Sequence, residues 1–195
     1  MEQEHVYKVY KIIAAEFDNT RYSKWGQVRV FLDALPKYSY LGDIGCGNGK
    51  YSNYRSDIIW HGVDTCLELL NCFESDKLIL ANGLNLPYKT ECFDAVISIA
   101  VIHHLSTIKK RHQFIKELIR TTKKGGQIYF MVWGKDQNIK KNWKNISGND
   151  YLIPWKNQEY RYYHLFEESE IKELCKDLIY SMIYEKDNWC VTITN

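Results

Sequence analysis

The segment that most constrains this chain is Asp43-Ile44-Gly45-Cys46-Gly47-Asn48-Gly49, which follows a short apolar run. Glycines at alternate positions permit positive φ angles and let a ligand approach the main chain closely. A loop of this kind at the carboxyl end of a strand is typical of nucleotide-binding α/β folds. A dinucleotide-binding loop follows the spacing GxGxxG, whereas here the third glycine comes one residue early and an acid precedes the first.

The acids near this loop favour a cationic ligand. The carboxylate of Asp43 suits a cationic amino group better than a pyrophosphate, and S-adenosylmethionine carries such a group together with a sulfonium. Asp64 ends the next predicted strand, where a carboxylate can accept both hydroxyls of a ribose. The pattern therefore predicts an S-adenosylmethionine site that contains Asp43, Gly45, Gly47, Gly49 and Asp64.

Predicted strands and helices alternate along the chain. Buried or alternating apolar runs predict strands over 38–44, 58–64, 78–81, 93–100 and 127–133, with late strands near 179–185 and 189–194. Apolar residues at helical spacing predict helices over 4–17, 25–35, about 108–123 and about 167–177. Gly125-Gly126 is expected to separate the third helix from its strand. This alternation indicates a parallel sheet covered on both faces, with an irregular insertion over 134–163 that forms part of a site.

The chain length and the cysteine content indicate one domain in a reducing compartment. A chain of 195 residues can build one sizeable core but not two comfortable ones. No apolar run approaches the roughly 20 residues of a membrane-spanning helix, and the acidic N-terminus does not resemble a targeting peptide. Six scattered cysteines without a CxxC pair predict free thiols and no metal site, with Cys46 in the loop the most exposed. Cytoplasmic, and also nuclear, localisation is expected.

The net charge of +2 says little about partners, because proteins that bind nucleic acid by bulk electrostatics usually carry a larger basic excess. Basic residues do cluster locally, over 109–111, 123–124 and between 135 and 144. Each cluster fits a solvated face as well as a phosphate contact. The charge pattern permits RNA binding without requiring it.

The glycine loop and Asp64 resemble motif I and the ribose-binding acid of the class I, Rossmann-like methyltransferases. The resemblance implies an α/β fold with a mostly parallel seven-stranded sheet, helices on both faces and a C-terminal antiparallel strand. It places Asn82 where that superfamily often has an aspartate that contacts the adenine amine. It also places Ala100 and Val101 against the cofactor. The single domain would comprise an N-terminal helical cap, a cofactor core, a substrate-site insertion and a C-terminal unit, over 1–36, 37–133, 134–166 and 167–195.

Longer stretches closely resemble the eukaryotic tRNA (carboxymethyluridine-34) methyltransferases, which complete the methoxycarbonylmethyl group on the wobble base. The stretches are 4–10, 20–22 with Trp25, 45–51, 97–107, 154–155, 161–166 and 187–189. The likeness covers nearly the whole chain, and His103-His104 and 161–166 are its most specific parts. It implies methyl transfer from S-adenosylmethionine to the carboxylate of 5-carboxymethyluridine at the wobble position of tRNA.

The chemistry of that reaction suggests roles for particular side chains. A carboxylate is already ionised at neutral pH, so the site needs a cation that orients it rather than a strong base. The residues expected to serve the reaction are Arg21, His103, Arg161 and Asn188. The candidate clamps for the carboxylate are Arg21, Arg161, His103 and His164, of which arginine matches it best, and Asn188 could bond a uracil edge. The residues that could stack the unpaired anticodon base are Trp25, Tyr162, Tyr163 and Trp189. Structural roles stay open for them, since Trp25 falls on an apolar stripe and the paired tyrosines could pack the insertion.

Two other functions remain open at this level. A small-molecule methyltransferase would share the glycine loop and would not need the basic clusters. A non-catalytic scaffold that binds tRNA or a partner is disfavoured by the intact loop and Asp64.

A partner surface is expected at the predicted strand 78–81. An apolar strand at the edge of a sheet invites pairing with another chain. The resembling enzymes bind a small zinc-containing activator protein, so strand addition near residues 70–81 is predicted, besides binding of the tRNA anticodon loop.

Overall fold

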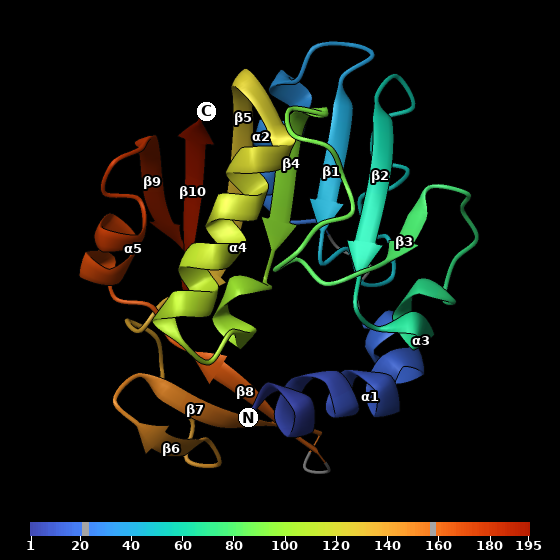
Figure 1. Ribbon diagram of the computed structural model, residues 1–195. Coiled ribbons are helices and arrows are strands. Elements are labelled where there is room, and N and C mark those ends of the chain that lie inside the picture. Colours follow the sequence, from blue (N-terminus) through green and yellow to red (C-terminus); the bar gives the residue numbers. More distant parts are fainter. Residues whose placement is uncertain (21–23, 157–158) are drawn as a thin grey trace.

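The computed structural model describes residues 1–20, 24–156 and 159–195, and its centre is a seven-stranded sheet (Figure 1). From edge to edge the strands are β3 (Leu78–Leu80), β2 (Ile59–Asp64), β1 (Tyr40–Ile44), β4 (Phe93–Ile99), β5 (Thr122–Trp133), β10 (Asn188–Thr194) and β9 (Ile179–Glu185). Strands β1 to β5 pair in parallel, and β10 runs antiparallel to β5 and β9. This confirms the predicted mostly parallel sheet and the edge position of the strand near residues 78–81.

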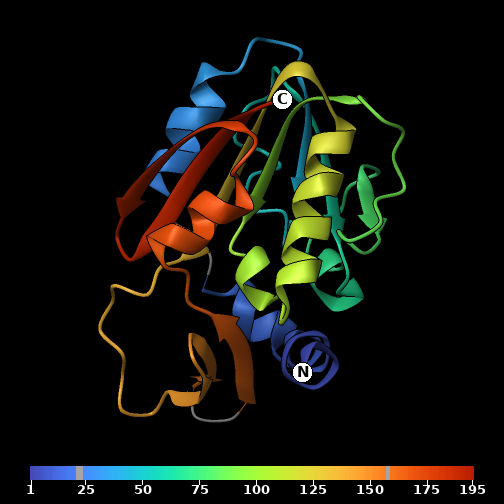
Figure 2. The ribbon, with the colours of Figure 1, turned by 60° about the vertical axis from the view of Figure 1, so that its left-hand side comes forward.

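Helices cover both faces of the sheet (Figures 1 and 2). Helix α2 (Gly26–Ala34) packs on one face, and α4 (Ile108–Thr121) and α5 (Glu168–Leu174) pack on the other. Strand β5 sorts its side chains by the two-residue period of a strand. Ile128 and Phe130 join the α4 cluster, while Tyr129 and Met131 join the α2 cluster. Burial on both faces explains why this strand reads as a continuous apolar run.

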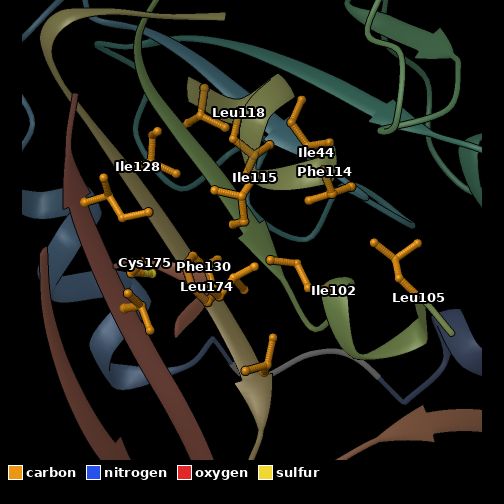
Figure 3. Close-up of a cluster of buried hydrophobic side chains, with 14 of the residues drawn as sticks. Ile44, Ile102, Leu105, Phe114, Ile115, Leu118, Ile128, Phe130, Leu174 and Cys175 are labelled. Atoms are coloured by element: carbon orange, nitrogen blue, oxygen red, sulfur yellow. The ribbon is translucent and has the colours of Figure 1, made fainter. Parts of the chain in front are cut away.

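The largest core lies between the sheet and α4 (Figure 3). Helix α4 begins at Thr107, whose side chain accepts a hydrogen bond from the Lys110 N–H and so caps the helix. Its apolar stripe is Phe114, Ile115 and Leu118, each at most 3% exposed. Packing in this core fixes the positions of the strand ends at which the site lies.

Strand β5 begins earlier than the sequence predicts. It starts at Thr122, so Gly125-Gly126 lies inside the strand and does not separate it from α4. Gly125 has φ of 74°, and the pairing with β4 shifts its register between Phe93 and Ala95. The glycines therefore mark an irregularity within a strand, which breaker residues in the sequence do not distinguish from a boundary.

The N-terminal helix lies below the carboxyl ends of the strands (Figure 1). It starts with a π-helical turn, Gln3–Tyr7, in which the Lys8 N–H bonds to the Gln3 carbonyl, and continues as α1 (Lys8–Asp18). The predicted helix over 4–17 is therefore confirmed, with a first turn that is π-helical, a distinction that apolar spacing does not reveal. The short helices α3 (Leu67–Leu70) and a 3₁₀ turn (Ile102–His104) also lie at this edge.

The insertion is an ordered sheet of its own. Strands β6 (Lys144–Ser147), β7 (Asp150–Trp155) and β8 (Glu159–His164) pair antiparallel in that order. The expectation of irregular structure over 134–163 is therefore wrong for these strands. The polar residues around β6 hide the pattern, while Tyr151, Ile153 and Tyr163 contribute to a small core. The sheet docks on the N-terminal helix, where Trp155 Nε1 donates to Glu16 at 3.2 Å.

In the described part of the chain, no helix combines the length and apolar character needed to cross a membrane.

Candidate cofactor and substrate site

A cavity of about 280 Å³ opens at the carboxyl ends of the parallel strands. One wall comes from the loops after β1, β2, β3 and β4, and the other from the N-terminal helix, the end of β5 and β8. The predicted cofactor residues on its lining are Asp43, Gly45, Gly47, Asp64, Asn82, Ala100 and Val101. The lining does not include Gly49. Parallel strands bring these distant positions together because their carboxyl ends meet at one edge.

The glycine loop forms a cradle that side chains would obstruct. Gly45, Gly47 and Gly49 have φ angles of 82°, 55° and 67°, which favour glycine. A Cβ on Gly45 would lie 2.2 Å from Val101 Cγ2, and one on Gly49 would lie 2.1 Å from Phe73 Cζ. A Cβ on Gly47 would meet only Leu69 Cδ1, at 4.0 Å. The space in front of Gly47 is thus open and belongs to the cavity.

Two carboxylates flank this cradle, buried Asp43 and half-buried Asp64. Asp43 Oδ2 accepts from Trp60 Nε1 at 3.2 Å, and Asp64 accepts from the N–H groups of Gly47 and Cys66 at 2.8 and 2.9 Å. Burial raises the pKa of Asp43 to about 7, helped by the charge of Asp64 and opposed by the Trp60 hydrogen bond. Burial also raises the pKa of Asp64. A cationic ligand would offset this cost, so the donor set fits the amino group and ribose of S-adenosylmethionine.

Ala100 shows backbone strain at the cavity. Its φ is 61°, a left-handed value that costs a non-glycine residue on the order of 1 kcal/mol or more. Its N–H donates to the Met131 carbonyl at 2.8 Å, which anchors the turn after β4. Strained residues cluster at functional sites, and Ala100 and Val101 both line this cavity.

Aromatic side chains form the wall opposite the glycine loop. Of the predicted substrate residues, Tyr163 belongs to this wall, while Trp25 lines the cavity beside Lys50, on the side of the glycine loop. Tyr10 and Trp133, which the sequence did not single out, line it as well. The rings of Trp133 and Tyr163 stack with centroids 4.5 Å apart. This wall is suited to a flat ligand such as a nucleobase.

The two adjacent histidines take different places. His104 lines the cavity, with Nε2 at 2.9 Å from the Tyr10 hydroxyl and Nδ1 at 2.7 Å from the Tyr162 carbonyl. His103 is fully buried behind the wall, where its ring lies 4.7 Å from that of Tyr163. His103 Nδ1 accepts from the Trp133 N–H at 3.2 Å, which places the proton of the neutral ring on Nε2. His103 thus supports the wall from behind.

Arg161 lies directly behind Tyr10 and Tyr163. Its guanidinium donates to the Tyr10 hydroxyl at 3.4 Å and lies 5.1 Å from the Tyr163 ring centroid and 4.9 Å from that of Trp155. The side chain is only 5% exposed, and within the described residues its Nε has no hydrogen-bond partner. All ion pairs among those residues involve other groups. A buried cation without a carboxylate partner is costly, which points to an anionic ligand.

Asn188 begins β10 and pairs with Trp133, so it lies beside the aromatic wall. It is 2% exposed, and its Nδ2 donates to the Lys186 carbonyl at 2.5 Å. Its buried Oδ1 has no partner in the ranges that the structure describes. Asn188 is not among the residues that line the cavity, so its unpaired acceptor lies behind the wall.

The remaining predicted residues lie away from the cavity or outside the described residues. The Tyr162 hydroxyl donates to Asp150 at 2.7 Å, and His164 bridges Asp150 and Glu170 at 2.6 and 2.8 Å. Trp189 packs in the α4 core, and its Nε1 donates to the Phe166 carbonyl. Arg21 falls on residues outside the described ranges.

The expectation that Cys46 is the most exposed cysteine is wrong. Cys46 is 7% exposed because the glycine loop folds inward, and Cys72 and Cys92 are more exposed. Its burial, with the nearby charges of Asp43 and Asp64, raises the pKa of the thiol.

Sheet order, glycine cradle and paired acids together define the class I S-adenosylmethionine-dependent methyltransferases. Residues 42–130 match the family model of the methyltransferase domain. The tRNA (carboxymethyluridine(34)-5-O)-methyltransferase of Schizosaccharomyces pombe is 35% identical over 97% of this chain and 96% of its own length. The Saccharomyces cerevisiae protein of that name is 32% identical over 97% of this chain and 95% of its own length. This chain belongs to the tRNA (carboxymethyluridine(34)-5-O)-methyltransferase family.

A solved structure extends the likeness in fold. A chain in the complex between the Haloferax volcanii Trm112 methyltransferase activator and a methyltransferase superposes with a TM-score of 0.70. The identity is 16%, with 97% of this chain and 96% of that chain covered. At that identity the comparison supports the fold alone.

Proposed function

We propose that this protein transfers the methyl group of S-adenosylmethionine to the carboxylate of 5-carboxymethyluridine at the wobble position of tRNA. Family membership supports the reaction class. The observation that carries the substrate chemistry is Arg161, a buried cation behind the aromatic wall of the cavity, whose Nε has no hydrogen-bond partner among the described residues.

The reaction needs little proton chemistry from the protein. The glycine cradle, Asp43 and Asp64 would hold S-adenosylmethionine, which would supply an electrophilic methyl group and leave as S-adenosylhomocysteine. A carboxylate is ionised at neutral pH and can act as the nucleophile without a general base. The guanidinium of Arg161 would hold and orient that carboxylate, whose two oxygens match its planar fork. Arg21 stays a second candidate for this task.

Other residues would position the uridine. The stacked rings of Trp133 and Tyr163 offer a surface for the base, with Trp25 across the cavity. The Oδ1 of Asn188, which has no partner among the described residues, would accept the N–H of the uracil edge. His103 would fix the wall through its bond with the Trp133 main chain. Tyr162, His164 and Trp189 would act indirectly, because their own partners hold β8 and β10 in place.

A small zinc-containing activator protein is the proposed partner, together with the tRNA anticodon loop. Strand β3 is an edge strand, and Leu80 on it is 55% exposed. Ile12 on α1 and Leu67 on α3 are 56% and 49% exposed, and α3 contacts both α1 and β3 (Figure 1). An apolar edge next to exposed leucine and isoleucine side chains suits strand addition by a partner. The fold likeness to the methyltransferase of the Haloferax activator complex supports this proposal.

The test is methyl transfer to matched tRNAs. The chain would be co-expressed with the activator and incubated with radiolabelled S-adenosylmethionine and tRNA that carries or lacks the carboxymethyl group. We expect label only on the carboxymethylated tRNA, released by mild alkali as a methyl ester is. The lone chain, assayed in parallel, should transfer less label if the activator covers β3.

Absence of label on both tRNAs, with cofactor binding demonstrated in the same preparation, would contradict the proposed substrate. It would leave the cofactor assignment intact and favour a small-molecule substrate. Equal label on both tRNAs would show that the carboxymethyl group is not the acceptor.

A further inference from the structure

The N-terminal segment forms one wall of the cofactor cavity and is fastened in place. Glu2, Val6, Tyr7 and Tyr10 line the cavity. The Glu2 carboxylate is 7% exposed and accepts from the Ser106 N–H and hydroxyl at 2.7 and 2.8 Å and from Lys110. Burial would raise the pKa of Glu2, but the hydrogen bonds outweigh it, so the pKa lies below its usual value. The first turn of the chain is therefore tied to the start of α4.

The π-helical turn that follows brings Tyr7 to the end of β3. Tyr7 is the last residue of that turn, and π-helical turns are frequent at functional sites. Tyr7 and Asn82 both line the cavity, and interaction with the Asn82 side chain opposes the rise that burial causes in the pKa of Tyr7. Asn82 Oδ1 accepts from the Leu84 N–H at 2.9 Å, so the acceptor oxygen of the amide is already engaged. The Tyr7 hydroxyl oxygen has a lone pair for a ligand donor.

The position of this pair identifies the part of the ligand that it would meet. Strand β3 lies beside β2, so the residues after β3 adjoin Asp64, the predicted ribose acid. Phe114 lies against Gly83, next to Asn82, while Leu69 and Val101 line the cavity beside the glycine loop. A ribose on Asp64 would place the attached base between these apolar groups, with its polar edge towards Tyr7 and Asn82. A flat base with one edge that donates hydrogen bonds fits this arrangement.

We propose that Tyr7 is a specificity residue for the cofactor, whose hydroxyl oxygen accepts a hydrogen bond from the 6-amino group of adenine. The inference rests on the cofactor assigned in the proposed function. The Asn82 oxygen already accepts from the Leu84 N–H. The Tyr7 oxygen would therefore supply the acceptor that the adenine amino group needs beside Asn82. The N-terminal segment then contributes to cofactor recognition as well as covering the cavity.

The test compares two ligands in two proteins by isothermal titration calorimetry. The ligands are S-adenosylhomocysteine and its purine analogue, which has hydrogen in place of the 6-amino group. Wild-type protein should prefer the amino ligand about 3- to 10-fold, the usual range for one neutral hydrogen bond. Tyr7→Phe should reduce this preference to about twofold or less, mainly by weakening the amino ligand. Tyr38→Phe, which removes an exposed hydroxyl away from the cavity, should leave the preference unchanged.

A second variant separates recognition from support of the fold. Adding Asn82→Asp to the Tyr7→Phe protein supplies a carboxylate acceptor, so the preference for the amino ligand should return. Equal loss of both ligands in Tyr7→Phe, or no loss of either, would overturn the inference while leaving the cofactor assignment standing. Wild-type protein that binds no S-adenosylhomocysteine would overturn the inference and the cofactor assignment together.

Discussion

The two halves of the site are built from different parts of the chain. In the cofactor half, formed by the loops after β1, β2, β3 and β4, backbone geometry sets the shape, as the positive φ angles of Gly45, Gly47 and Ala100 show. In the substrate half, formed by α1, the end of β5 and the sheet of β6, β7 and β8, side chains set the shape. Tyr10, Trp133 and Arg161 come from distant segments and meet only in the folded protein. Local sequence therefore determines the shape of the cofactor half, whereas contacts between distant segments determine the shape of the substrate half.

The largest expected effect is on catalysis and comes from replacing Arg161, which should impair the substrate half and leave the cofactor half intact. Arg161→Ala should lower kcat/KM for carboxymethylated tRNA about 100- to 1000-fold, since a charge-assisted contact in a dry site contributes on the order of 3–4 kcal/mol. The affinity for S-adenosylhomocysteine should stay within about twofold. Arg161→Lys should recover only part of the rate, because lysine keeps the charge and loses the fork. Steady-state kinetics with calorimetry would check this, and full activity of the lysine variant would exclude a bidentate clamp.

The reciprocal change lies in the glycine loop. Gly47→Ala should weaken S-adenosylhomocysteine binding by about tenfold or more, because its Cβ would enter the open space in front of the loop. The free energy of unfolding should fall by only about 1 kcal/mol, the cost of alanine in a left-handed conformation. Gly45→Ala is the contrasting variant, since its Cβ overlaps Val101 and should destabilise the fold itself. Unchanged ligand affinity in Gly47→Ala would remove Gly47 from the cofactor half.

The acidity of Asp43 should make cofactor binding depend on pH. A cationic amino group favours the ionised carboxylate, so affinity for S-adenosylhomocysteine should rise about tenfold from pH 6 to 8 and level off above the pKa of about 7. The stability of the ligand-free protein should change in the opposite direction with pH. Because folding raises this pKa, the folded state binds an extra proton between about pH 4 and 7, and the stability contribution falls as pH rises through that window. Asp43→Asn should flatten both profiles in calorimetry and thermal unfolding; an unchanged binding profile would contradict the role of Asp43.

The smallest effect on ligand binding is expected at His164, whose partners are structural. His164→Ala leaves Asp150 and Glu170 without their bridge and should cost about 2 kcal/mol, or about 4–8 °C in Tm for a chain of this size. Affinity for S-adenosylhomocysteine should not change. The pKa of Glu170 is lowered to about 2, so its stabilising contribution is complete above its usual pKa and is lost as pH falls from there towards 2. Thermal unfolding between pH 2 and 7 would test this, and an unaltered Tm in His164→Ala would contradict it.

The positions of residues that follow the parallel strands could be predicted from the sequence, while their roles stay a prediction. The glycine loop, Asp64, Asn82 and Ala100 follow predicted strands, and parallel strands bring their carboxyl ends to one edge. The sheet itself was predictable for the same reason, because both-sided burial leaves continuous apolar runs.

The substrate half was harder to predict, because adjacent residues of one segment point in opposite directions and the sequence does not show which of them face the site. In β8, Arg161 and Tyr163 lie on the side of the strand that faces Tyr10, while Tyr162 and His164 turn to Asp150, as the two-residue period requires. The sequence did not reveal β8 as a strand, so it could not sort these residues. The 3₁₀ turn likewise places His104 on the cavity and His103 behind it. Tyr10 and Trp133 read as ordinary apolar positions of a helix and a strand.

The most direct test of a site built for a carboxylate uses two tRNAs that differ in one group. One carries 5-carboxymethyluridine and the other 5-carbamoylmethyluridine, which has nearly the same shape without the charge. Binding of each to the wild-type protein and to Arg161→Lys, with S-adenosylhomocysteine present, would be measured at fixed salt concentration. We predict that the wild-type protein prefers the carboxylate at least tenfold and that Arg161→Lys loses most of this preference. Equal affinity of the wild-type protein for both tRNAs would contradict the proposed role of Arg161.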